Sequence, residues 1–224
     1  MFAGHVGTAL AIGRAERRVN VVVFITAALF LDLVLWTFVL LGWESVTIPA
    51  NFASTHQPEF AFPYSHGLVA GAIWSAFAGC AAVVWYSDSG AARWRIAFLI
   101  AAAVFSHWIL DVLVHRPELP LAGAASAKVG LGLWDSMPVA LGAEAAFVAV
   151  GLGLFLPGSG LSRPRSIGLA TLVLVLLAFT VAGMTFAPPP PSAFAMAGSS
   201  LLTLLAVCAL AWWLGEPILM EENR

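Results

Sequence analysis

Long apolar blocks separated by short polar segments run along the whole chain. Six blocks are long enough to cross a membrane, at residues 20–41, 62–86, 95–114, 138–156, 166–186 and 192–214. A helix needs about 20 predominantly apolar residues to cross the roughly 30 Å hydrocarbon core of a bilayer. The pattern predicts an all-α fold: a polytopic membrane helix bundle with about six transmembrane helices, embedded in a lipid bilayer.

A further apolar stretch at residues 2–13 is too short to span the bilayer. Such a segment is expected to lie at the interface, to enter the membrane as a re-entrant helix, or to pack against the bundle. Three arginines separate it from the first long block: Arg14, Arg17 and Arg18. This order differs from that of a cleavable signal peptide, so we expect the first long block to be a retained anchor.

Composition supports membrane insertion and excludes one class of partner. Hydrophobic residues make up 61% of the 224 residues and charged residues 10%, whereas soluble domains average roughly 45–50% and 25%. The net charge is −2 and the basic residues are scattered, so nothing indicates binding to nucleic acid. Cys80 and Cys208 lie inside apolar blocks without a metal-ligand spacing, and we expect them to be small buried hydrophobes.

The basic residues predict the orientation, because short loops rich in Lys and Arg stay in the cytoplasm. With both termini cytoplasmic, only Arg116 and Lys128 fall outside, and the inner set is Arg14, Arg17, Arg18, Arg93, Arg95, Arg163, Arg165 and Arg224. We therefore expect both termini inside. The two long outer connections, residues 42–61 and 115–137, are then candidates for a lid over an outward-facing site.

The most specific chemical signal is the four-residue spacing of His107, Asp111 and His115 in the third block. Residues four apart share one face of a helix, so these side chains form a ladder. An ionised Asp at the centre of a membrane helix costs about 2.5–3.5 kcal/mol and normally faces a partner or a wet cavity. Asp32 and Glu144, in the first and fourth blocks, pose the same problem, although the sequence does not place Glu144 relative to the others. A divalent cation with imidazole ligands would neutralise such carboxylates, and mixed His and Asp ligands suit zinc, iron or manganese.

Two more histidines fit this site. His66 lies at the outer end of the second block, just after Pro63, which favours a helix start. His5 lies in the short N-terminal stretch. A plainer interpretation remains open for each signal: a lone intramembrane His also serves as a hydrogen-bonded packing residue, and the ladder also fits a simple hydrogen bond between helices.

The order of these residues resembles that of the membrane-bound, YdjM-like metal-dependent hydrolases. In that family a His on a short N-terminal helix is followed by the motifs Pro-Asp-x-Asp, Thr-His-Ser-Leu and Ser-His-x-x-x-Asp. The matching positions here are His5, Asp32, His66 within Tyr-Ser-His-Gly-Leu, and His107 and Asp111 within Ser-His-Trp-Ile-Leu-Asp. The aspartate motif is reduced to one residue and the Arg that precedes the second motif is missing, so two metals receive weaker support than one.

The resemblance also implies a division of the chain. It covers residues 1–156, which are expected to form a four-helix membrane core with the metal site. Residues 157–224 are then two additional transmembrane helices and a short C-terminal tail. Segments 114–120 and 130–136 resemble a distinct branch of bacterial membrane proteins, which implies the bacterial cytoplasmic membrane.

Together these features predict a metal-dependent hydrolase acting on an ester or phosphoester of a lipid or other membrane-proximal substrate. Zinc is the first choice of divalent transition metal, and its expected ligands are His5, Asp32, His66, His107 and Asp111. Asp32 is also a candidate general base, and His115 or Arg116 would meet the substrate at the outer mouth.

The alternative is a non-enzymatic membrane subunit, in a homo-oligomer or a larger complex. Its His and Asp residues would form an ion or proton relay, or only fix helix packing. A hydrolase needs at least three ligands that converge on one point with an open coordination position, whereas a relay strings the same residues along a path.

Introduced cysteines test the orientation. In intact cells an impermeant maleimide should label cysteines placed in residues 42–61, which are predicted to lie outside, and should leave those in residues 87–92 unlabelled. The reverse pattern would overturn the orientation and move the mouth near His66 and His115 to the cytoplasmic side.

Overall fold

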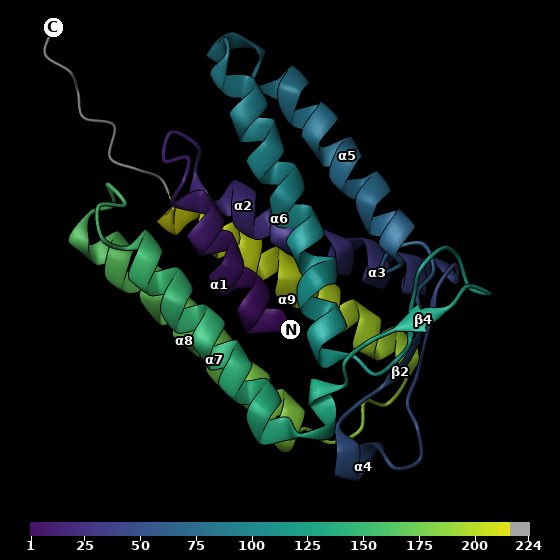
Figure 1. Ribbon diagram of the computed structural model, residues 1–224. Coiled ribbons are helices and arrows are strands. Elements are labelled where there is room, and N and C mark those ends of the chain that lie inside the picture. Colours follow the sequence, from purple (N-terminus) through teal and green to yellow (C-terminus); the bar gives the residue numbers. More distant parts are fainter. Residues whose placement is uncertain (216–224) are drawn as a thin grey trace, which may run out of the picture.

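The computed structural model describes residues 1–215, which form a bundle of helices with two small hairpins at one end (Figure 1). The helices are α1 (Phe2–Gly13), α2 (Val21–Ala28), α3 (Phe30–Leu41), α4 (Phe52–Thr55), α5 (Leu68–Trp85), α6 (Ala92–Val114), α7 (Met137–Phe155), α8 (Arg163–Thr185) and α9 (Ala193–Leu214). Single 3-10 turns are η1 (Ser87–Ser89) and η2 (Leu133–Asp135). Strand β1 (Ser45–Thr47) pairs antiparallel with β2 (Glu59–Ala61), and β3 (Leu119–Pro120) with β4 (Lys128–Val129).

The predicted all-α membrane bundle is confirmed. Five of the described helices, α5 to α9, are long and apolar enough to cross a membrane, and α2 with α3 make a sixth candidate span. The second block starts later than Pro63 suggested, because α5 begins at Leu68 and the residues before it form a turn. Cys80, expected to be buried, is instead exposed on α5.

The first span is broken. Helices α2 and α3 meet at an angle of 48°, with Leu29 between them at φ −95° and ψ 2°. A break inside a membrane needs new partners for the freed backbone groups, and these come from neighbouring helices. The bend therefore creates a polar corner inside the bundle, and Asp32 lies one turn beyond it.

Helix α1 packs inside the bundle, one of the three outcomes expected for a segment too short to span. Its N-terminal end lies in the middle of the molecule (Figure 1), where Met1 is 7% exposed and His5 is 1% exposed. The backbones of α1 and α7 touch at two glycines: a Cβ at Gly7 would overlap the backbone of Phe147, and a Cβ at Gly151 would overlap the carbonyl of Gly7. This close crossing of α1 and α7 keeps His5 in the interior of the bundle.

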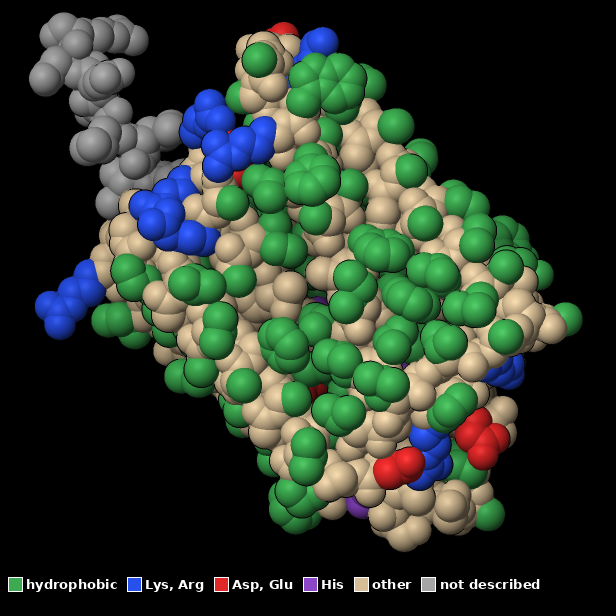
Figure 2. Space-filling view, in the orientation of Figure 1, with side chains coloured by type: hydrophobic (Ala, Val, Ile, Leu, Met, Phe, Trp, Pro, Cys, Tyr) green, Lys and Arg blue, Asp and Glu red, His purple; other side chains and the backbone are tan. Residues whose placement is uncertain are grey.

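Basic side chains gather at the end of the bundle that carries the loop between α1 and α2, while the middle is apolar (Figure 2). Arg17 donates to the carbonyls of Pro157 and Gly158, and Arg95 to that of Ala15. In the same loop Glu16 accepts two hydrogen bonds of 2.7 Å from Arg18, and these bonds lower the pKa of the Glu16 carboxyl. The loop is thereby tied to α6 and to the connection between α7 and α8.

Adding a methyl group to α7 tests the α1 crossing. Gly151→Ala should lower the free energy of unfolding by about 1–3 kcal/mol, because overpacking at a backbone contact forces the two helices apart. Gly153→Ala on the same helix meets nothing within 4 Å and should be neutral or slightly stabilising. Thermal unfolding of both variants in the same detergent measures the difference, and equal melting temperatures would contradict the close crossing.

Candidate metal centre

The turn before α5 holds His66 in place. The carboxylate of Glu44 accepts hydrogen bonds from the backbone N–H groups of Tyr64 (2.8 Å) and Ser65 (2.9 Å) and from the Ser65 hydroxyl (2.7 Å). The Ser65 Oγ in turn lies 2.8 Å from His66 Nδ1. Because a carboxylate only accepts, the Ser65 hydroxyl donates to Glu44, and His66 Nδ1–H donates to Ser65. His66 Nε2 therefore carries a lone pair when the ring is neutral.

The corner of the broken span holds His107. Its Nδ1 lies 2.6 Å from the carbonyl oxygen of Ala28, the last residue of α2. A carbonyl also only accepts, so Nδ1 carries the hydrogen and Nε2 carries the lone pair. Ligand histidines are usually fixed in this way, with the second ring nitrogen donating to a carbonyl or carboxylate.

These two lone pairs point at each other. His66 Nε2 and His107 Nε2 are 3.1 Å apart, and their side chains are 2% and 0% exposed. Two bare nitrogens at this distance repel, so the contact favours either a proton on one ring or a metal ion bound by both Nε2 atoms.

A carboxylate oxygen completes the triangle. Asp111 Oδ2 lies 3.4 Å from His66 Nε2 and 3.2 Å from His107 Nε2. In a tetrahedral zinc site with bonds of about 2.0–2.1 Å, neighbouring ligand atoms are roughly 3.3 Å apart. The three edges match one face of such a tetrahedron. We call His66, His107 and Asp111 the ligand triad.

The other oxygen of Asp111 faces α1. Asp111 Oδ1 lies 3.1 Å from His5 Nε2 and 3.2 Å from the Met1 nitrogen. The His5 ring stacks on His107 with centroids 3.7 Å apart, and its Nδ1 has no hydrogen-bond partner among the described residues. His5 thus supports two members of the triad, and with Asp32 and His107 it forms a second group whose ligand atoms lie within 4.8 Å of one another.

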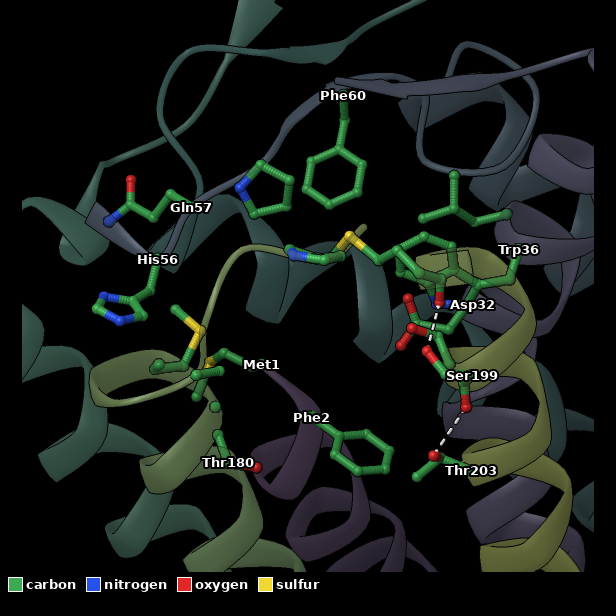
Figure 3. A pocket seen from close by; sticks show the side chains of 18 of the residues that line it. Met1, Phe2, Asp32, Trp36, His56, Gln57, Phe60, Thr180, Ser199 and Thr203 are labelled. Atoms are coloured by element: carbon green, nitrogen blue, oxygen red, sulfur yellow. Dashed lines mark hydrogen bonds between the residues drawn. The ribbon is translucent and has the colours of Figure 1, made fainter. Parts of the chain in front are cut away.

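Asp32 stands on the open side of the triad. Its Oδ1 is 3.6 Å from His66 Nε2 and 3.7 Å from His107 Nε2. Unlike the triad it is 20% exposed, and it lines a cavity of about 410 Å³ that His66 and Asp111 also reach (Figure 3).

His115 and Glu144 flank the triad without joining it. His115 caps the end of α6, with Nε2 3.8 Å from Asp111 Oδ2 and Nδ1 2.6 Å from Glu118 Oε1. Glu144, which the sequence left unplaced, accepts a 2.6 Å hydrogen bond from the backbone N–H of Gly4. It satisfies a free donor in the first turn of α1, which every helix start exposes.

The structure thus brings together all five of the predicted metal ligands, from α1, α3, the turn before α5, and α6. Arg116 does not join them and pairs with Asp135 at 2.6 Å on the surface. The sequence reasoning missed Glu44 and Ala28 as supports. Glu44 carried no motif, and a backbone carbonyl becomes available only through the break at Leu29.

Comparisons of this chain with known protein families, curated proteins and solved structures found no match. The fold and the site define a class on their own: a membrane helix bundle with buried His and Asp groups that could hold a metal ion.

Removing the Ser65 hydroxyl tests how His66 is positioned. Ser65→Ala should weaken metal binding by about 10–100-fold, the usual cost of losing an outer partner of a ligand. Ser75→Ala is the matched control, because that hydroxyl donates only to Gly71 O on its own helix. Competition with a fluorescent zinc chelator gives the affinities, and equal values for the two variants would show that Ser65 does not orient a ligand.

Proposed function

We propose that this protein is an integral membrane metal-dependent hydrolase that cleaves an ester or phosphoester of a lipid or other membrane-proximal substrate. The observation that carries the proposal is the convergence of the triad atoms at 3.1–3.4 Å beside a cavity. Catalytic zinc sites commonly have three protein ligands and an open fourth position. The resemblance to the YdjM-like hydrolases rests on the same residues.

Zinc suits the donor set best, because two imidazoles and one carboxylate at tetrahedral spacing are typical zinc ligands. A bound divalent cation would supply Lewis acidity and lower the pKa of water towards neutrality. With a metal ion bound through Nε2, the two imidazoles would be neutral and Asp111 would contribute one negative charge, so the triad would leave most of the charge of the ion available to polarise a substrate.

Asp32 is the proposed general base. It is the predicted ligand most accessible from the cavity, and its 3.6–3.7 Å separation from the imidazole nitrogens leaves it within reach of a water beside the triad. It would take the proton from the attacking water. His115, held by Glu118 and also lining the cavity, is placed to pass a proton to the leaving group.

One observation favours a second candidate, a proton relay. A row of five side chains has successive separations of 3.1, 3.2, 3.8 and 2.6 Å: His66, His107, Asp111, His115 and Glu118. Of these steps, the one from Asp111 to His115 is longer than a hydrogen bond. A relay would place a proton, not a metal ion, between the two facing nitrogens.

We further propose the bacterial cytoplasmic membrane as the location, with the basic end of the bundle in the cytoplasm. The gathering of Arg side chains at that end supports this orientation (Figure 2). Arg224, which the sequence argument also assigned to the inside, lies outside the described residues. The division of the chain after residue 156 stays a prediction.

Metal content and activity test the proposal together. Protein purified without chelator should carry about one transition metal ion per chain by mass spectrometry. Asp111→Asn and His107→Gln should remove the ion, and should lower esterase or phosphatase activity by more than the 10–100-fold that an outer partner costs. Both variants keep a polar side chain of similar size, so circular dichroism and size exclusion should show a folded bundle.

The control is Asp88→Asn, which removes an exposed carboxylate from the turn between α5 and α6. It should change neither metal content nor activity. A metal-free wild-type protein, or triad variants with full activity, would exclude the hydrolase and leave the relay or a packing role.

A further inference from the structure

The cavity beside the triad has two chemically different parts. Ionisable side chains of the lining include Asp32, His66, Asp111, His115 and Glu144. Most of the other lining residues are apolar, including Phe2, Leu35, Trp36, Phe179, Met184 and Leu204. A pocket with a few convergent polar groups and long apolar walls fits an amphiphile whose polar part lies at one end.

Helices α8 and α9 supply the outer wall. In Figure 3, Thr180 of α8 stands on one side of the cavity and Ser199 and Thr203 of α9 on the other, with Phe2 between them. The hydroxyls of these three residues donate to carbonyls of their own helices, at 2.9, 3.0 and 2.8 Å. With their hydroxyl hydrogens used in this way, these three residues offer mainly hydrocarbon contact to the cavity.

The same wall reaches the lipid-facing surface. Phe179 is 56% exposed and Ser199 is also exposed, and both line the cavity. They belong to helices long enough to span, so exposure there means contact with lipid chains. An opening between α8 and α9 would lead from the cavity sideways into the bilayer.

The volume limits what enters. The cavity of about 410 Å³ lies within the roughly 300–1,000 Å³ that is usual for pockets that bind small molecules. A space of this size accommodates one hydrocarbon chain.

We propose that this cavity is the chain subsite of the enzyme: one hydrocarbon chain enters from the bilayer between α8 and α9 and places its ester at the triad. This rests on the proposed hydrolase function and names its substrate class, an ester with one buried chain. In the reaction, the oxygen of water bonds to the acyl carbon or phosphorus, and the bond from that atom to the leaving oxygen breaks. One proton of the water ends on the leaving oxygen.

Gly183 offers a clean way to fill the subsite. It lies on α8 in the cavity wall, and a Cβ there meets nothing within 4 Å. Gly183→Leu should thus place a side chain in the cavity without disturbing helix packing. Gly198→Leu is the matched control, because Gly198 on α9 is equally open but is not part of the cavity wall.

Binding is measured without turnover, in nanodiscs of phosphatidylcholine, using a diazirine-labelled palmitate. The label should attach to peptides covering residues 179–184 and 196–204, and Gly183→Leu should reduce this labelling at least tenfold while Gly198→Leu leaves it unchanged. Wild-type protein stripped of metal with a chelator should still be labelled, because the α8 and α9 wall is independent of the metal.

Turnover supplies the second measurement, with p-nitrophenyl carboxylates and with alkyl phosphates, each from 2 to 16 carbons. The active series should show kcat/KM rising with chain length, and Gly183→Leu should shift the optimum to shorter chains. The proposed subsite would be wrong if these peptides were not labelled, or if Gly183→Leu and Gly198→Leu had equal effects, even if short esters were cleaved. Labelling that persists in a protein without metal or hydrolysis would instead exclude the proposed function and leave a chain-binding cavity.

Discussion

The carboxylate of Asp111 is the group around which this bundle is organised. A charge inside a bilayer has to meet partners from its own protein, and Asp111 is 2% exposed. Its two oxygens have different partners. Oδ1 contacts His5 and the Met1 nitrogen, and Oδ2 faces His66 and His107. Three segments far apart in the chain therefore meet at one point.

Helix α1 and the residue before it supply the partners of Asp111 Oδ1. Ending a helix inside the membrane exposes its first backbone donors, and Glu144 accepts from one of them at Gly4. The glycine contact with α7 brings the two backbones close enough for that carboxylate to reach. Glu144 is thus explained as a cap for a helix start, and the metal hypothesis does not need it as a ligand.

The spans could be predicted from the sequence because they follow from the length of each apolar block. The shared face of His107 and Asp111 could be predicted because it follows from the period of a single helix. The sequence did not predict the break at Leu29, because no Pro or Gly marks it. The carbonyl of Ala28 beside the break is satisfied by His107, which lies 79 residues away. Pro63 misled for a related reason: Glu44 draws the backbone of Tyr64 and Ser65 into a turn, so α5 starts only at Leu68. The sequence identified the candidate metal ligands. It did not predict which of them form the triad and which lie beside it, because that depends on contacts between segments far apart in the chain.

Charge accounting explains why one carboxylate belongs in the triad and another beside it. A divalent ion held by two neutral imidazoles and Asp111 would keep one positive charge, and Asp32 at 3.6–3.7 Å from the imidazole nitrogens would offset it. The Met1 nitrogen beside Asp111 and the Glu144 carboxylate at the start of α1 would balance each other in the same way. A neutral group is the least costly one to keep among apolar walls. In the proposed hydrolysis, proton transfer from water to Asp32 would leave the total charge of the group and the water unchanged. It would move negative charge onto the attacking oxygen and then onto the substrate oxygen, where a bound cation would attract it. The apolar surroundings strengthen this attraction, because little solvent screens it. The apolar wall proposed to hold a hydrocarbon chain would therefore also strengthen the electrostatic stabilisation of the transition state at the triad.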